Sequence, residues 1–350
     1  MTSASELAER IRAAAETSAP LVVRGGGSKD FLGRRTEGET LDVAALRGIV
    51  HYEPTELVIT ARAGTPLTEI EAALAERGQM LGFEPPHFGA TATLGGTLAC
   101  GLSGPARPFR GAARDFVLGA QLVNGAGEIM HFGGEVMKNV AGYDVSRLMC
   151  GAYGTLGVLL EISLKILPQP AEQRFLVLDC DSATAFARMA QWQREPLPVS
   201  GLCYDGDRLH VRLAGAAQAV AAAQRRIGGD SDPAGGQYWE RLREQRSGFF
   251  AGSEPLWRVS VPATTRALPI DGKQLIDWGG ALRWVKTAAP DEVVFAAARA
   301  AGGHAMRFRG TQDGDVFQPL PEALLALHRR LKLAFDPHGI LNRGRLYPDL

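Results

Sequence analysis

Residues 89–104 read GATATLGGTLACGLSG, a stretch made mainly of glycine, other small residues and threonine. It has neither the alternation of a half-buried strand nor any charged residue, and we expect the region from Phe83 to Gly104 to be irregular. A run of this length without periodicity inside a compact domain is usually functional. Backbone that carries so few large side chains can lie flat against a long polar ligand and donate many hydrogen bonds to it.

Two further glycine-rich loops flank this stretch. Arg24-Gly25-Gly26-Gly27-Ser28 follows the apolar residues 21–23, and a third loop runs through KNVAGYD (138–144) and CGAYGTLG (150–157) into an apolar run. Successive glycines let neighbouring backbone N–H groups converge on a phosphate, because no Cβ blocks the approach. Each loop alone could be a tight turn. Three in order before residue 160, each beside a predicted strand, favour an extended nucleotide ligand.

Two common nucleotide-binding fingerprints do not account for these loops. The first loop, read as Gly25-x-Gly27-x-x-Asp30, lacks the third glycine of the Rossmann motif, and no periodic helix follows it. The only Gly-Lys pair, Gly272-Lys273, is followed by glutamine instead of the serine or threonine of a P-loop.

The composition is that of a globular protein without net charge. The chain has 350 residues, with 38 Lys plus Arg and 38 Asp plus Glu, so no overall field attracts nucleic acid or an anionic membrane. Hydrophobic residues make up 45% and charged residues 22%, which excludes disorder, collagen and coiled coil. At about 150 residues per domain, the length predicts roughly two domains.

Export and membrane insertion are not indicated. The first twenty residues carry dispersed charges and predict an amphipathic helix on Leu7, Ile11 and Ala14 instead of a signal peptide. The longest uncharged, alanine-rich stretch, 213–223, is about half of what a bilayer span requires. The four cysteines stand singly, without the spacing of zinc or iron–sulfur ligands, and predict a reduced cytoplasmic protein.

The predicted elements before residue 170 mix strands and helices. We expect a strand at 55–64, a helix from Thr65-Pro66 to Gly78 and a hairpin over 115–134 with Asn124-Gly125 in its turn. A long buried strand ends at Pro168.

Beyond Pro170 a β-α-β-β-α series is followed by further strands and helices, with a loop expected at 229–236. This is an α+β pattern. We divide the chain into a domain at 1–169, a second α+β domain at 170–318, and a C-terminal helix and tail at 319–350.

Five segments together resemble a known family: RGGGS (24–28), GATATLGGTLACGLSG (89–104), SGPARPFRGAARDFVLG (103–119), MKNVAGYDVSRLMCGAYGTLGVLLEISLKILP (137–168) and FDPHGILNRGRL (335–346). They are similar to the vanillyl-alcohol oxidase-type (PCMH-type) FAD-binding family, which includes D-lactate and glycolate dehydrogenases. Within it, the chain is most similar to the FAD-binding E subunits of bacterial glycolate oxidases. The resemblance implies FAD held across two α+β subdomains, a cap domain, and a tail that returns to the FAD-binding domain.

The resemblance also implies FAD-binding residues by position. Residues 24–28 would hold the pyrophosphate, 90–96 would run beside the pyrophosphate and ribitol, 101–104 would lie near the flavin edge, and 151–158 would meet the adenine half. The implied residues are Arg24, Gly25, Gly26, Gly27, Ser28, Ala90, Thr91, Thr93, Leu94, Gly95, Gly96, Gly101, Ser103, Gly104, Gly151, Gly154, Leu156, Gly157, Val158, Asn342 and Arg345.

The sequence differs from some relatives at two kinds of site, the one for covalent flavin attachment and the one for a metal ion. Relatives that bind flavin covalently place a histidine just before the serine of the first loop, where this chain has Gly27, so we expect non-covalent FAD. Dehydrogenases of the D-lactate type carry clustered cap histidines for a divalent metal. The seven histidines here form no HxH or HxxxH pair, and we expect no metal site.

Oxidation of a 2-hydroxy acid needs a base for the hydroxyl proton and a cation for the carboxylate. We single out Arg283, near Trp278 and Trp284 in the sequence, because aromatic neighbours strengthen a guanidinium–carboxylate pair by excluding water. An arginine on a strand edge could equally be a solvated surface group. His304 is the candidate base.

The resemblance implies oxidation of glycolate to glyoxylate by hydride transfer to flavin. Its partners would be a second FAD-containing glycolate oxidase subunit and an iron–sulfur subunit, in the cytoplasm or peripheral at the inner membrane through those partners. Two alternatives stay open: a non-catalytic electron-relay or assembly subunit, and a stand-alone FAD-dependent 2-hydroxy acid or alcohol dehydrogenase. The basic residues between His328 and Arg345 predict either a solvated helix face or a docking surface for an acidic partner.

Overall fold

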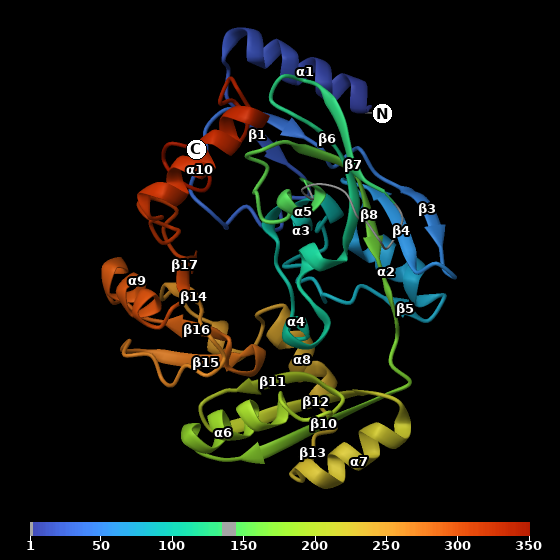
Figure 1. Ribbon diagram of the computed structural model, residues 1–350, viewed down its shortest axis with the longest axis vertical. Helices are drawn as coiled ribbons and strands as arrows, with labels where there is room; N and C mark the ends of the chain where they lie inside the picture. Colours follow the sequence, from blue (N-terminus) through green and yellow to red (C-terminus); the bar gives the residue numbers. More distant parts are fainter. Residues whose placement is uncertain (1–2, 135–144) are drawn as a thin grey trace.

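The computed structural model describes residues 3–134 and 145–350 (Figure 1). Its first half is built on a five-stranded antiparallel sheet in the order β3-β4-β8-β6-β7. The central strand β8 is buried on nearly its whole length, as its apolar run predicts. The strands are β3 (Ile49–Glu53), β4 (Val58–Arg62), β6 (Val117–Val123), β7 (Ile129–Gly133) and β8 (Val158–Lys165).

Helices cover this sheet through the apolar faces that the sequence predicts. The first helix, α1 (Ala4–Thr17), begins at a capping box and buries the face of Leu7, Ile11 and Ala14. The short elements of this half are α2 (Leu67–Ala75), β5 (Gln79–Met80), α4 (Arg107–Arg110), η1 (Ala113–Phe116), α5 (Val145–Leu148) and β9 (Leu167–Pro168).

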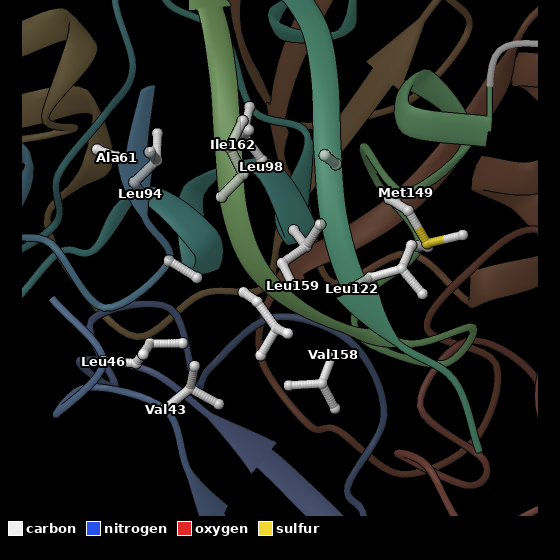
Figure 2. Packing of buried hydrophobic residues seen from close by; sticks show 14 of the residues in the cluster. Val43, Leu46, Ala61, Leu94, Leu98, Leu122, Met149, Val158, Leu159 and Ile162 are labelled. Atoms are coloured by element: carbon white, nitrogen blue, oxygen red, sulfur yellow. The ribbon is translucent and has the colours of Figure 1, made fainter. Parts of the chain in front are cut away.

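The expectation of an irregular region over 83–104 is wrong for its middle part, where the helix α3 (Leu94–Cys100) forms. The Thr93 hydroxyl caps its first turn. Leu94 and Leu98 turn toward β4 and β8 in the core (Figure 2). Only these two leucines mark a helical face, because the other positions are small, and the periodic signal is therefore weak.

The C-terminal tail returns to the start of the chain. The strands β1 (Leu21–Arg24) and β2 (Glu39–Asp42) pair in parallel, and Leu341 of the tail bridges Leu21. In Figure 1 the helix α10 (Glu322–Phe335), which precedes the tail, lies beside the first half of the molecule. The first glycine loop thus begins where β1, β2 and the C-terminal tail meet.

The second half holds an eight-stranded sheet in the order β13-β10-β12-β11-β15-β16-β14-β17, paired antiparallel throughout. Residues 229–236, expected as a loop, contain β13 and the start of α8. The elements are β10 (Glu172–Asp179), α6 (Ser182–Trp192), β11 (Val199–Tyr204), β12 (Arg208–Gly215), α7 (Ala217–Ile227), β13 (Asp230–Ser231), α8 (Gly235–Arg243), η2 (Gly248–Phe250), β14 (Leu256–Ser260), β15 (Lys273–Asp277), η3 (Trp278–Gly280), β16 (Leu282–Lys286), α9 (Asp291–Ala300) and β17 (His304–Arg309).

The two faces of the β14–β17 region meet different partners. Successive side chains alternate between faces, so Val285 packs with residues of α9, whereas its neighbour Trp284 packs with Leu102 and Tyr153 of the first half. One face of this sheet is therefore an interface between the halves. None of the helices in the described part of the chain is long and apolar enough to cross a membrane.

Candidate functional site

A cavity of about 360 Å³ opens where β1 ends. Most of its walls come from the first glycine loop, α3 and the C-terminal tail, which are far apart in the sequence. Tyr153 of the third loop and Gln312 also line it. Nine of the residues implied by the resemblance line it, namely Arg24, Gly25, Gly26, Gly27, Ser28, Thr93, Gly96, Asn342 and Arg345.

A smaller cavity of about 70 Å³ continues from the first and shares with it part of its wall, including Gly25, Gly96 and Asn342. Its remaining lining is mostly apolar, and Figure 2 shows part of it, with Val43, Met149, Val158 and Leu159. The implied residues Gly95, Gly154, Gly157 and Val158 line this second cavity. A polar cavity joined to an apolar one suits a ligand with a charged middle and a flat ring at one end.

The first glycine loop presents free hydrogen-bond donors to the larger cavity. Among the described residues, no protein acceptor is bonded to the backbone N–H groups of Gly25, Gly26, Gly27 or Ser28. Unpaired backbone donors are costly unless a ligand or water satisfies them. Four consecutive donors at the end of a strand form a concavity that binds an anion such as a pyrophosphate.

Close approach of two loops explains part of the glycine requirement. A Cβ on Gly26 would lie 1.5 Å from the backbone oxygen of Thr91, and one on Gly25 would lie 2.6 Å from Thr93 Oγ1. Gly27 has φ +73°, in the left-handed region that favours glycine. The loop is thus a tight turn, and its role in binding a phosphate stays a prediction.

Positive side chains surround the larger cavity. Arg24 pairs with Asp30 at 2.7 Å, and the tail residue Arg345 donates to the Asp30 carbonyl at 3.2 Å. Lys29 is 7% exposed, and its Nζ lies 3.2 Å from the His87 carbonyl oxygen. Burial lowers the pKa of Lys29 from its usual value. Such cations suit a ligand that carries negative charge.

The basic stretch near the C-terminus does not form one docking face. Lys332 is buried, where its Nζ donates to the Thr155 and Leu341 carbonyls and pairs with Asp336, each at 2.7 or 2.8 Å. Arg345 lines the larger cavity. Lys332 fastens α10 to the loop before β8, because a buried ammonium needs several acceptors. Arg345 instead joins the tail to the segment after the first glycine loop, through the Asp30 carbonyl.

Several implied residues lie outside these two cavities. Ser103 and Gly104 line a third cavity between the halves. Leu94 and Leu156 are buried in the core of the first half. Ala90, Thr91, Gly101 and Gly151 do not line the two joined cavities either. The KNVAGYD part of the third loop lies outside the described residues.

Arg283 does not lie on the same sheet face as Trp284, although the sequence hypothesis expected it beside the tryptophans. It pairs with Val259 on the sheet face opposite to that of Trp284. Its guanidinium is fully buried, lies over Phe186 and donates to main-chain carbonyls at Gly280 and Thr265. Because adjacent residues of a strand point to opposite faces, closeness in sequence to the tryptophans does not place Arg283 beside them.

His304 begins β17 and is exposed at that end of the strand. It shares a sheet face with Met306, but it lines none of the cavities described above. No group of three or more His, Cys, Asp or Glu residues within 3–134 and 145–350 is arranged to hold a metal ion.

Tyr153 is a wall residue that the sequence hypothesis missed. It lines both joined cavities, is 9% exposed, and has φ +53°, a value that is rare for a bulky residue. Its N–H donates to the Ala99 carbonyl at 2.9 Å, which ties the third loop to α3. In the sequence, its position between Gly151 and Gly154 of the third glycine-rich loop could have indicated that Tyr153 lies at the cavity.

Comparisons with known proteins agree with this geometry. Residues 1–133 match the family model described as an FAD binding domain, and residues 318–346 match the C-terminal domain of FAD linked oxidases. The chain is 52% identical over 344 residues to the glycolate oxidase subunit GlcE of Escherichia coli (strain K12), covering 98% of this chain and 97% of that protein.

More distant relatives match part of the chain. The glycolate oxidase subunit GlcD of Bacillus subtilis (strain 168) is 29% identical over 187 residues, which cover 52% of this chain and 39% of that protein. A solved structure of alkyldihydroxyacetonephosphate synthase superposes with a TM-score of 0.66 at 16% identity, covering 96% of this chain and 74% of that one. The latter likeness shows a shared fold.

Proposed function

The chain belongs to the family of the glycolate oxidase subunit GlcE, among the FAD-linked oxidoreductases, and from this we propose that it is an FAD-binding subunit that takes part in oxidising glycolate to glyoxylate. The observation that carries this proposal is the pair of joined cavities. Their lining combines four free backbone N–H groups with an apolar slot, and the close relative matches over nearly the full length of both chains.

We place FAD in these cavities by the chemistry of their walls. The pyrophosphate would accept hydrogen bonds from residues 25–28, with Lys29 and Arg345 as nearby cations. The adenine would lie in the apolar slot beside Gly154 and Val158. When bound, FAD supplies a two-electron acceptor for a hydride. Attachment is non-covalent in this proposal, because Gly27 offers no side chain to bond with the flavin.

The domain division follows the same reasoning. Residues 1–169 would form the FAD-binding domain, 170–318 the cap, and 319–350 the returning segment that completes the cofactor site. The hydrogen bonds of Lys332 and Asn342 to the loop before β8 support the role of the tail.

We further propose a complex with a second FAD-containing glycolate oxidase subunit and an iron–sulfur subunit that passes electrons onward. The four cysteines of this chain are free, which fits a cytoplasmic chain that leaves cluster ligation to a partner. Attachment to the inner membrane, if present in cells, would run through those partners.

The test is anaerobic reduction of the purified, FAD-loaded chain by glycolate. Bleaching of the flavin absorbance by the chain alone supports direct substrate oxidation. Bleaching only when the second flavin subunit is added supports the electron-relay or assembly alternative. Sustained turnover of the isolated chain with an artificial acceptor would favour a stand-alone dehydrogenase, and absence of FAD at any ratio would overturn the cofactor site itself.

A further inference from the structure

A third cavity, of about 30 Å³, lies at the interface between the two halves. One wall is Leu102–Pro105, the end of the stretch that the family resemblance places at the flavin edge, and the opposite wall includes Arg258, Asp277 and Trp284 of the cap. At about 10 to 15 Å³ for one water-sized sphere, it has room for only a few non-hydrogen atoms. Its position and size suit a small ligand at the edge of the flavin.

Arg258 is a cation in this cavity, and the buried carboxyl group of Asp277 is an acidic group that acts on it there. Its register opposite Trp284 and Met306 places it on the sheet face that meets the first half. The guanidinium lies 5.0 Å from the ring centre of Trp278, whose other neighbour is Arg107 at 4.5 Å. Within the described residues, Arg258 has no ion pair and donates no hydrogen bond. Burial lowers its pKa to about 10, because the guanidinium loses hydration.

Asp277 offers a carboxylate oxygen to the same cavity. Its side chain is 4% exposed, and Oδ1 accepts a hydrogen bond from the Trp278 N–H at 2.7 Å. In the described part of the chain, Oδ2 has no hydrogen-bond partner. Burial raises the pKa of Asp277 to about 7, so the carboxyl can take up or release a proton near neutral pH. The charged or titratable groups around it are Glu84, Cys203, Arg212, Tyr238, Arg243 and Arg258.

Gln245 adds a further polar group to the lining of this cavity. It is 7% exposed and lines this cavity, and its Oε1 is a buried acceptor that receives no hydrogen bond from any of the residues that the structure describes. Buried polar groups are almost always satisfied. Three of the lining residues, Phe88, Gln245 and Trp278, also have left-handed backbone, with φ between +53° and +54°. Such strain collects at functional sites, where surrounding structure enforces it.

We propose that this cavity is the substrate subsite of the chain and binds a two- or three-carbon 2-hydroxy acid, with Arg258 as the carboxylate anchor and Asp277 as the proton acceptor. The inference rests on the proposed function. The hydroxyl proton passes to Asp277, a carbon–oxygen double bond forms, and the hydrogen on the same carbon leaves with its electron pair to the flavin. The acid loses two electrons and two hydrogens, which the carboxylate and the flavin receive. Gln245 Oε1 would accept a hydrogen bond from the ligand hydroxyl or from a bridging water.

The test uses the FAD-loaded full chain and oxalate, a dicarboxylate that cannot give up a hydride. Oxalate binding is followed by the change in the flavin absorption spectrum and by tryptophan fluorescence. We expect Arg258→Met to weaken oxalate binding by about 30-fold or more while FAD content stays the same, with partial recovery in Arg258→Lys. The exposed cap residue Arg266 gives the matched control, and Arg266→Met should bind oxalate as the unaltered protein does.

Asp277→Asn separates the two roles. We expect this variant to keep oxalate affinity within about threefold, since the anchor remains, while glycolate reduces its flavin at least about 100-fold more slowly. Equal oxalate affinity in Arg258→Met and the unaltered protein would overturn the subsite even if glycolate still reduced the flavin. Arg258-dependent oxalate binding without any reduction by glycolate, with or without partners, would instead overturn the proposed function and leave the anion subsite standing. If Arg258→Met does not fold, Arg258→Lys carries the comparison.

Discussion

The Asn342 side chain accepts a hydrogen bond from the Val23 backbone N–H at 2.8 Å, across 319 residues of sequence. The same side chain donates through Nδ2 to the Tyr153 carbonyl at 2.6 Å. Asn342 has φ +42°, a conformation that asparagine tolerates better than most residues. One buried amide thus joins β1, the third loop and the tail, so the cavities are complete only after the C-terminal segment has returned.

Replacing Asn342 with leucine should therefore disturb both stability and cofactor binding. The change leaves the Val23 N–H and the Tyr153 carbonyl without partners, each worth about 1–3 kcal/mol when buried. We expect the free energy of unfolding to fall by about 2–4 kcal/mol and FAD to be lost on gel filtration. Urea titration and flavin absorbance measure the two effects. Full FAD retention in Asn342→Leu would contradict the role of the tail.

Gly96→Leu tests whether the cavities hold the cofactor. Gly96 lines both joined cavities, and a Cβ there would meet only Thr93 Oγ1, at 3.2 Å, so the protein should still fold. The leucine side chain would occupy the cofactor's space, and we expect colourless protein with an unchanged far-UV circular dichroism spectrum. The control is Gly248→Leu, where an added Cβ meets nothing within 4 Å. Yellow, stoichiometric Gly96→Leu protein would refute this placement.

Glu84→Gln should loosen the contact between the two halves. The Glu84 carboxylate lies 2.8 Å from Arg212 Nη2 of the cap and 3.3 Å from Arg110 Nη1 of the first half. Removing one member of a buried charge group leaves the others uncompensated, and we expect a loss of about 3 kcal/mol in unfolding free energy.

The surface pair of Glu195 and Arg226 provides the control for that measurement. Glu195→Gln should change the unfolding free energy much less than Glu84→Gln does, because water screens exposed ion pairs. Both variants can be compared by guanidinium denaturation. Equal effects of the two substitutions would mean that the Glu84 contacts add nothing to the joining of the halves.

The raised pKa of Asp277 predicts a pH dependence of stability. The folded protein holds this proton up to about pH 7, whereas the unfolded chain releases it near 3.8. Folding therefore takes up a proton between these values, and the stabilising contribution of Asp277 is present below pH 3.8 and is lost as pH rises through 7. We expect the unfolding free energy of the unaltered protein, relative to Asp277→Asn, to decrease from pH 4 to pH 7.

Thermal unfolding across this pH range measures that difference, with the exposed Asp271→Asn as control. The control should track the unaltered protein at every pH. A flat difference between the unaltered protein and Asp277→Asn would show that the carboxyl titrates alike in the folded and unfolded chain.

Local signals in the sequence were sufficient for much of the fold. The apolar spacing of Leu7 and Ile11 marked α1, the Asn124-Gly125 turn marked the hairpin of β6 and β7, and the unbroken apolar run marked β8. Helix α3 was not predicted, because only two leucines mark its apolar face. Its remaining positions are mostly small residues, which gave the segment the character of a loop.

By itself, the sequence determined the family and the cofactor class, through the resemblance carried by its five motif segments. It also predicted a phosphate-binding role for the first glycine loop, because consecutive glycines expose neighbouring backbone N–H groups. It did not determine which arginine faces the interface. Only the tertiary structure places Arg258, and not Arg283, in the cavity between the halves, since strand register decides which sheet face a side chain occupies. The hydrogen bonds of the Asn342 side chain to Val23 and Tyr153 likewise join residues far apart in the sequence, so no local pattern predicts them.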